Sequence, residues 1–163
     1  MSGSHHQASI VNIHATGVLV DGHGVLIRGP SGAGKSLLAL ELLARHGEAR
    51  LVADDRVDLE PRGGNLLMHA PPALAGRIEL RGRGIVRRSF VSPAPVHLVV
   101  DLVDDLVRLL EADEFTTDLS GVTLSRCPVP RRGVIDPAHQ LLLVGEALAA
   151  LDYARDVHRQ KFT

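Results

Sequence analysis

Lysine is nearly absent from this 163-residue chain, which holds sixteen arginines but only two lysines. Aromatic residues are also few, with one Tyr, three Phe and no Trp, which argues against the base-stacking surfaces of RNA-binding modules. The formal net charge of −1 provides no strong field that would gather nucleic acid or an anionic membrane. We therefore expect neither of them as a partner.

Cysteine and long apolar runs are scarce as well. Cys127 is the single cysteine, which excludes an intramolecular disulfide and a zinc cluster, and we expect it to be a buried, inert thiol. There is no signal peptide and no apolar run of 18 residues, which indicates a cytoplasmic protein. Residues 1–8 are polar, include His5 and His6, and are expected to form a mobile tail before one catalytic domain over residues 9–160.

One of the two lysines lies in a stretch that matches the P-loop pattern G-x-x-x-x-G-K-[ST] in full. Its members are Gly29, Pro30, Ser31, Gly32, Ala33, Gly34, Lys35 and Ser36. An ammonium is a compact point charge that can lie between phosphate oxygens, whereas a guanidinium is a rigid planar fork. The alternative is an ordinary glycine-rich turn before a helix, so the flanking sequence has to be considered.

The flanks supply what a P-loop requires. Residues 24–28 form a short apolar run that predicts a buried strand, and residues 36–46 are strong helix formers, with Gly47 as the expected C-cap. Backbone N–H groups of residues 31–36 would then surround a phosphate at the helix N-terminus. Lys35 would reach the terminal phosphates and the Ser36 hydroxyl would help hold Mg²⁺. The sequence therefore predicts a nucleotide-binding site.

The rest of the chain predicts a compact α/β domain. Further strands are expected near residues 17–20, 51–53, 66–69, 97–103 and 122–125, and a long helix over residues 137–158. The strands over residues 17–20 and 24–28 flank a hairpin turn over residues 21–24. This turn contains His23, to which we assign no role. Helices and strands do not alternate regularly, so we expect an atypical P-loop topology.

Two sites could supply the carboxylates that a P-loop needs for Mg²⁺ and for accepting a proton. Asp54 and Asp55 follow an apolar strand one helix beyond the loop, and Asp101 lies in a later apolar strand. Neighbouring side chains in extended chain point to opposite faces, so one of the paired acids could orient the metal while the other meets the substrate. A plain surface turn at residues 54–56 is the alternative, and spacing alone does not choose between the two sites.

Four motifs taken together resemble the HPr kinase/phosphorylase family. They are His14-Ala-Thr-Gly-Val-Leu-Val20, the P-loop, Leu51-Val-Ala-Asp-Asp-Arg-Val57 and Ile78-Glu-Leu-Arg-Gly-Arg-Gly-Ile85. The resemblance spans roughly residues 10 to 150 and implies a phosphoenolpyruvate-carboxykinase-like topology in a P-loop kinase domain. It also implies phosphorylation of a serine of an HPr-like phosphocarrier with ATP or pyrophosphate, and reversal by inorganic phosphate. The chain looks like a short form without the additional N-terminal domain, and family members are typically hexamers.

The resemblance also implies roles for individual residues. Asp55 would be the base that accepts the serine proton, with Asp54 beside it as a metal ligand. Glu79 would contact a second Mg²⁺, His14 would be an active-site histidine, and Arg108 would stabilise charge on the transferring phosphoryl group. Without the resemblance, we would interpret Glu79 as a surface strand residue and His14 as a packed or solvated side chain. We would interpret Arg108 as a surface charge. Glycines 82 and 84 should adopt positive φ and let their loop approach the phosphates.

One segment departs from the family pattern and bears on the direction of the reaction. Members with strong phosphorylase activity have Gly-Arg-Asn shortly after Pro-Val-Pro, whereas here Pro128-Val-Pro130 is followed by Arg131 and Arg132. These two arginines could bind phosphate instead or remain solvated charges. The kinase direction is therefore the firmer expectation.

Three other classes of protein remain as alternatives. A small-molecule kinase of the nucleotide type would use an arginine-rich lid, which residues 77–88 could supply. A GTPase-like switch is disfavoured because no Asn-Lys-x-Asp motif is present. A non-catalytic nucleotide-dependent sensor would bind ATP without turnover.

Overall fold

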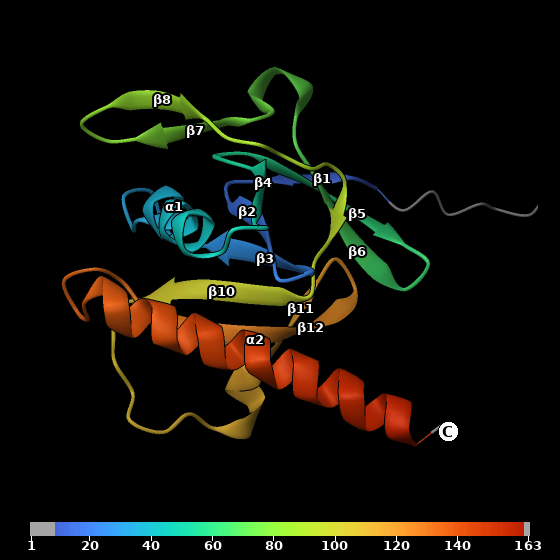
Figure 1. Cartoon of the computed structure of the whole chain (residues 1–163). Helices are drawn as coiled ribbons and strands as arrows, with labels where there is room; N and C mark the ends of the chain where they lie inside the picture. Colours follow the sequence, from blue (N-terminus) through green and yellow to red (C-terminus); the bar gives the residue numbers. More distant parts are fainter. Residues whose placement is uncertain (1–8, 162–163) are drawn as a thin grey trace, which may run out of the picture.

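A mixed six-stranded sheet lies at the centre of the molecule, which the computed structural model describes over residues 9–161 (Figure 1). The strand order is β11-β12-β10-β3-β2-β4. The bounds are β2 Thr16–Val20, β3 His23–Arg28, β4 Arg50–Ala53, β10 Leu98–Val103, β11 Thr116–Leu119 and β12 Val122–Pro130. The turn between β2 and β3 has positive φ at Asp21 and Gly22, as a tight hairpin requires.

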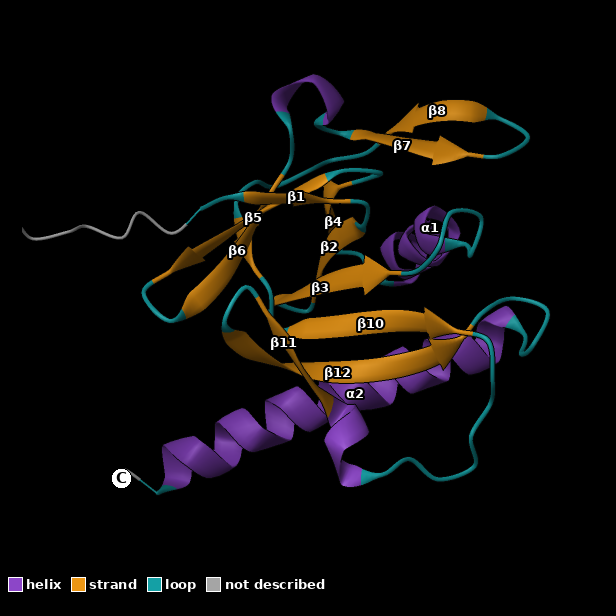
Figure 2. Ribbon diagram, turned by 180° about the vertical axis from the view of Figure 1, so that it is seen from behind, coloured by secondary structure: helices purple, strands orange, loops and turns teal. Residues whose placement is uncertain are grey.

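Side chains of the central sheet alternate between two hydrophobic cores. On β3, Val25 and Ile27 belong to one core and Leu26 to the other. The first core packs against α1 Lys35–Arg45 and α2 Pro137–Gln160, so both helices cover the same face of the sheet (Figure 2). The second core packs against a four-stranded antiparallel sheet of order β1-β5-β6-β9, with bounds β1 Val11–Ile13, β5 Val57–Arg62, β6 Asn65–His69 and β9 Ala94–Pro95. The prediction of an α/β fold without regular alternation is confirmed.

A separate two-stranded hairpin, β7 Arg77–Leu80 with β8 Gly84–Arg87, lies above α1 in Figure 1. The fully buried side chain of Ile78 anchors it in the helix-side core. Two short 3-10 helices, Pro72–Leu74 and Ala112–Phe115, complete the fold. Among residues 9–161, no helix is both long and apolar enough to cross a membrane.

Strand direction brings the functional segments to one edge of the central sheet. Strands β3, β10 and β12 run parallel, and β4 shares their direction because β3 and β4 are both antiparallel to β2. The P-loop follows β3, the paired acids follow β4, and Arg131 follows β12. Ligands of open α/β sheets bind at this carboxyl edge.

Some details differ from the sequence-based expectations. Helix α1 ends at Arg45 and is capped by His46 in an extended conformation, so Gly47 is not the left-handed cap that was expected. His23 is the first residue of β3 rather than part of the turn, and its buried imidazole bonds Asp152 on α2. Cys127 is buried as expected, and burial raises the pKa of its thiol to about 11, although Arg126 opposes this. The expected tail over residues 1–8 lies outside the described residues.

Candidate active site

The P-loop connects β3 to α1 and leaves the N-terminus of α1 open. Gly32 and Gly34 have φ of 82° and 96°, a left-handed conformation that favours glycine. No side chain caps this helix and its first turn contains no acid. Its free N–H groups and the positive end of its dipole are therefore available to an anion.

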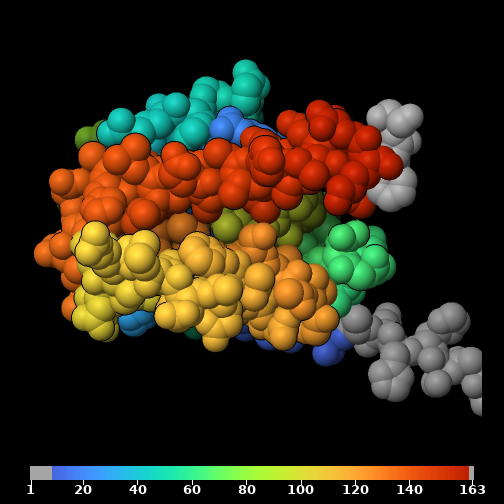
Figure 3. Space-filling model, turned by 90° about the horizontal axis from the view of Figure 1, so that it is seen from below, coloured from blue at the N-terminus to red at the C-terminus, as the bar shows by residue number. Residues whose placement is uncertain are grey.

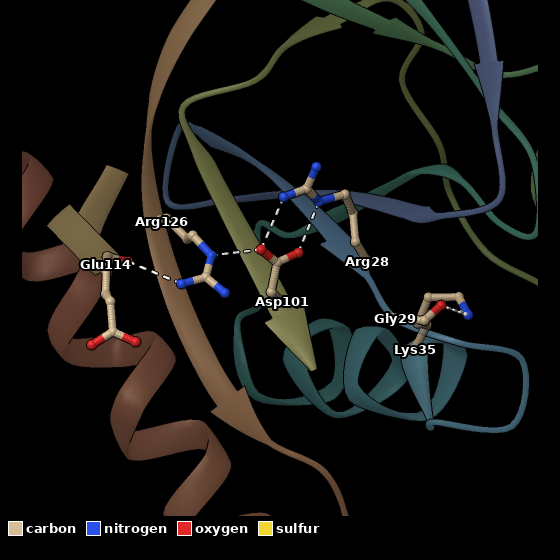
Figure 4. Close-up of polar contacts among 6 residues, drawn as sticks. All are labelled: Arg28, Gly29, Lys35, Asp101, Glu114 and Arg126. Atoms are coloured by element: carbon tan, nitrogen blue, oxygen red, sulfur yellow. Dashed lines mark hydrogen bonds and ion pairs between the residues drawn. The ribbon is translucent and has the colours of Figure 1, made fainter. Parts of the chain in front are cut away.

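Lys35 is folded back over the loop to which it belongs. Its Nζ donates hydrogen bonds to the carbonyls of Gly29 at 2.8 Å and Pro30 at 3.1 Å, and Figure 4 shows the first of these. Burial lowers the pKa of the ammonium, and the carboxylates of Asp54 and Asp55 act in the opposite direction. Gly29 and Pro30 thus hold the lysine in place and do not themselves line the cavity beside the loop.

Asp54 is buried, and it accepts hydrogen bonds only from uncharged donors. Its Oδ1 accepts hydrogen bonds from Thr16 Oγ1 at 2.8 Å and from Ser36 Oγ at 2.7 Å. Its Oδ2 accepts from the backbone N–H of Glu79 at 3.2 Å. These bonds fix the carboxylate beside the P-loop serine without neutralising its charge.

Asp55 differs from its neighbour in exposure and backbone conformation. It has φ of 68°, which is uncommon for a residue other than glycine, and its side chain is 68% exposed. Its Oδ1 lies 3.1 Å from Nε2 of His14, which comes from the segment just before β2. The two adjacent acids therefore present one buried and one accessible carboxylate, and their separate roles stay a prediction.

A cavity of about 510 Å³ joins these groups at the carboxyl edge of the sheet. Its polar lining comes from His14, Thr16, residues 31–36, Asp54, Asp55, Arg77, Glu79, Arg81, Arg131 and Arg132. Glu79 and the two flanking arginines come from the β7–β8 hairpin, whose Gly82 and Gly84 have φ of 90° and 104°, as expected for this loop. The structure thus places most of the predicted site residues around one volume.

Arg108 is the exception among the predicted catalytic residues. It is exposed in the segment that follows β10 and does not line the cavity. Arg132 does line it, and its Cδ would lie 3.6 Å from a Cβ placed on Gly34 of the P-loop. Arg131 also lines the cavity and is held by Asp104 at 2.9 Å. Within one chain, the arginines that reach the site are therefore those of the β7–β8 hairpin and those after β12.

Asp101, the other carboxylate candidate, is bound by two arginines (Figure 4). Arg28 donates two hydrogen bonds to it, at 2.8 and 2.9 Å, and Arg126 Nε donates one at 2.6 Å. Burial alone would raise the pKa of Asp101, but the hydrogen bonds and charges of the two arginines outweigh burial and lower it. Asp101 is therefore part of an internal ion-pair network and does not line the cavity.

Thr16 lines the cavity but was not predicted as a site residue from the sequence. It lies inside the His14–Val20 motif, is fully buried, and its hydroxyl bonds the inner acid. A threonine at the start of an apolar strand is also an ordinary strand residue, so no separate signal in the sequence marks it. Its role depends on the pairing of β2 with β4, which only the fold reveals.

The oxygen donors at this site suit a magnesium ion held jointly with a nucleotide. Among the described residues, no three His, Cys, Asp or Glu side chains form a cluster able to hold a metal by themselves. Mg²⁺ usually takes one or two carboxylates and completes its shell with water and substrate phosphates. Asp54, the Ser36 hydroxyl and the nearby Glu79 fit that smaller requirement.

Comparison with known proteins gives a consistent result. Residues 5–150 match the family model described as the HPr Serine kinase C-terminal domain. The HPr kinase/phosphorylase of Clostridium tetani (strain Massachusetts / E88) is 35% identical over 147 residues, which cover 82% of this chain and 46% of that protein. That of Bordetella petrii is 36% identical over 132 residues, covering 73% and 42%. The chain spans about half the length of these curated relatives.

The fold also resembles a solved structure. The Hpr(Ser) kinase/phosphatase from Coxiella burnetii superposes with a TM-score of 0.75 at 26% identity. The match covers 91% of this chain and 97% of that one. The similarity therefore extends over most of the fold.

Proposed function

Because the chain belongs to the family of the HPr serine kinase C-terminal domain, we propose that it transfers a phosphoryl group from ATP to a serine of an HPr-like phosphocarrier. The observation that carries the proposal is the convergence of a P-loop lysine and two unlike carboxylates on one cavity. A nucleotide-binding module needs only the loop. A buried acid at the metal position and an exposed acid beside it are what a transfer to an incoming hydroxyl requires.

The P-loop and its neighbours would bind the phosphates of ATP. N–H groups of the P-loop and the Lys35 ammonium would face the terminal phosphates, while Asp54, Ser36 and Glu79 would hold Mg²⁺. Mg²⁺ held there would supply positive charge to the phosphate oxygens. Lys35 suits this role because its lowered pKa reflects a partly dehydrated ammonium, whose attraction for phosphate is stronger than in water.

Asp55 would act as the base in the forward direction. The serine oxygen of the carrier forms a bond to the γ-phosphorus while the bond from that phosphorus to the bridging oxygen breaks and ADP leaves. The serine proton passes to the exposed Asp55 carboxylate. His14, 3.1 Å away, would orient that carboxylate.

The reverse reaction would use the same groups with inorganic phosphate as the acceptor. An oxygen of the free phosphate would bond to the phosphorus of the phosphoserine while the bond from that phosphorus to the serine oxygen breaks. Pyrophosphate would leave, and the proton on Asp55 would return to the serine oxygen. Arg131 and Arg132 line the cavity and offer two guanidiniums for the attacking phosphate. They would replace the Gly-Arg-Asn segment that the sequence lacks.

The test of the proposed function is the substitution Asp55→Asn. Asparagine tolerates positive φ, so the fold should survive, and transfer of labelled phosphate from ATP to HPr should fall by about a thousandfold. Nucleotide affinity, measured by calorimetry, should stay within about twofold because the P-loop is intact. Asp156→Asn, on the exposed end of α2, is the matched control.

A panel of acceptors separates this proposal from a small-molecule kinase. That alternative has one observation in its favour, since Arg77 and Arg81 line the cavity as lid arginines would. Incubation with labelled ATP and HPr, AMP or CMP should label HPr alone. Labelling of a nucleotide would overturn the proposal, and ATP binding without any transfer would indicate a sensor.

A further inference from the structure

A second cavity lies at the edge of the central sheet opposite the P-loop. Its volume is about 330 Å³, and it shares no described lining residue with the active-site cavity. His23, the first residue of β3, and His97, just before β10, place it at the amino ends of these parallel strands. A nucleotide at the P-loop would not reach this cavity, so a ligand bound in it would be a separate one.

Three elements that are distant in the sequence enclose the second cavity. They are the turn between β5 and β6, the start of β12 and the second half of α2, which Figure 3 shows in green, orange and red. Leucine and valine side chains supply its apolar lining, and its polar lining consists of His23, Asn65, His97, Thr123, Ser125 and Arg155. Among the described residues that line it, none is an acid. The lining therefore favours an anion with an apolar part.

Arg155 contributes a guanidinium whose charge no carboxylate of the described chain balances by direct contact. Its one hydrogen bond within that part of the chain goes to Nδ1 of His23 and is long, at 3.4 Å. Asp152, one turn earlier on α2, accepts from Nε2 of His23 at 2.7 Å and does not line the cavity. The planar fork of the Arg155 guanidinium therefore remains available for a carboxylate, which it can bind with two parallel hydrogen bonds.

His97 offers a second donor. Its Nδ1 accepts a hydrogen bond from the backbone N–H of Gly24 at 3.0 Å, so the proton of the neutral ring is on Nε2. Within the described chain, nothing accepts a hydrogen bond from that Nε2–H. Burial lowers the pKa of His97, and the charges of His23 and Arg155 lower it further, so the ring is neutral at pH 7.

The charge of the lining selects the kind of anion. His97 is neutral, and His23 accepts a hydrogen bond at Nδ1, which a protonated imidazole cannot do. Arg155 therefore supplies the one full positive charge among the described lining residues. A single guanidinium balances a monoanion such as a carboxylate, whereas a phosphate dianion would keep one charge uncompensated.

We propose that the second cavity binds a small monocarboxylate with a short apolar chain. The carboxylate would lie between the Arg155 guanidinium and the free N–H of His97, and the chain would lie against Leu66, Leu124 and Leu151. The partly dehydrated cavity strengthens the attraction between guanidinium and carboxylate relative to open water. The site does not depend on the kinase activity, because the two cavities are lined by different residues.

Butyrate is a suitable probe, because it combines a carboxylate with a short apolar chain. The amide ¹H–¹⁵N resonances of Gly24 and His97 report on the cavity, since the N–H of Gly24 is bonded to the His97 ring. At constant ionic strength, butyrate should move them in a saturable way, with a dissociation constant of about 1 mM. Butanamide, which has the same shape without the charge, should bind at least about tenfold more weakly. Inorganic phosphate should also bind these residues more weakly, because it lacks an apolar part.

Substitutions locate the site. Arg155→Gln removes the charge at an exposed position, so the fold should survive and the affinity for butyrate should fall at least about tenfold. Arg159→Gln is the matched control, because Arg159 lies one turn further along α2, is exposed and does not line the cavity. Its affinity should stay within about twofold of wild type. Lys35→Ala changes the P-loop instead and should bind butyrate as the wild type does.

Four results would overturn the proposal. The first is that the resonances of Gly24 and His97 do not respond to butyrate. The second is that Arg155→Gln binds butyrate as tightly as the wild type. The third is tighter binding of phosphate or butanamide than of butyrate at these residues, and the fourth is loss of butyrate binding in Lys35→Ala, which would place the anion at the P-loop.

Discussion

Asp54 follows one strand of the central sheet and Asp101 lies on another, but their hydrogen-bond donors differ in charge. Both follow runs of buried apolar residues on strands that point to the same edge, and both accept three hydrogen bonds. Asp101 accepts all of them from the guanidiniums of Arg28 and Arg126. Asp54 accepts its bonds from two hydroxyls and a backbone amide.

The two carboxylates differ in how much of their negative charge is balanced by their hydrogen-bond donors. Two arginines overcompensate the carboxylate of Asp101, lower its pKa and use its lone pairs, so it stabilises the fold. Neutral donors hold Asp54 in place and leave its negative charge acting on its surroundings, where it raises the pKa of Lys35 against the effect of burial. A buried carboxylate with neutral partners is available to a cation, and one with arginine partners is not.

The largest effect should come from Asp54→Asn, which removes the charge and keeps the shape. We expect phosphoryl transfer to fall by about a thousandfold, because the metal loses its carboxylate beside Ser36. Stability should fall by about 1–2 kcal/mol, less than at Asp101, since the amide nitrogen of Asn leaves one of three uncharged donors without an acceptor. Parallel kinase assays and urea unfolding measure the two quantities. Unchanged activity with lost stability would mean that Asp54 is a structural residue like Asp101.

Asp101→Asn should give the reverse pattern. Two partly buried guanidiniums lose their counter-charge, and the free energy of unfolding at pH 7 should fall by about 3 kcal/mol. Transfer activity at a temperature where the variant is folded should stay within about threefold of wild type, because Asp101 does not line the cavity. A variant as stable as wild type would contradict the ion-pair network.

The pH dependence of the same variant sharpens the test. The pKa of Asp101 is lowered in the folded chain from its ordinary value of 3.8. Its stabilising contribution is therefore complete above that value and is lost as the pH falls through the lower folded pKa. Unfolding curves for wild type and Asp101→Asn should differ at pH 7, and the difference should shrink as the pH falls below 3.8. Asp118→Asn, on the exposed side of β11, serves as the control.

The sequence predicted the parts of the fold that local pattern determines. The strands around residues 17–20, 24–28, 51–53, 66–69, 97–103 and 122–125 and both helices are confirmed to within a few residues, apart from β12, which continues to Pro130. Strands β1, β5, β7, β8, β9 and β11 were missed because they are short or carry charged residues or proline, and they have few buried positions. Their strand conformation comes from pairing with neighbours rather than from their own apolar pattern.

The sequence could not show whether the paired acids or Asp101 lie at the site, because the deciding contacts again come from distant parts of the chain. Arg28 is 73 residues from Asp101 and Arg126 is 25 residues away, so nothing local shows that Asp101 is neutralised. The paired acids line the cavity, but two of the three donors to Asp54 come from β2 and from the hairpin. Motif spacing located the acids, and tertiary pairing decided which of them face the cavity.

The smallest effect should come from Thr16, whose hydroxyl is one of the neutral donors on which the comparison depends. Thr16→Val keeps the buried volume and leaves Oδ1 of Asp54 with the Ser36 hydroxyl alone. We expect stability to fall by about 1 kcal/mol and the affinity for Mg²⁺-ATP to fall by three- to tenfold, because the carboxylate can rotate away from the metal position. Thr16→Ser retains the hydroxyl and should restore the affinity. Equal affinities for Thr16→Val and Thr16→Ser would show that the donor does not orient Asp54, and that burial beside the P-loop is enough to set its direction.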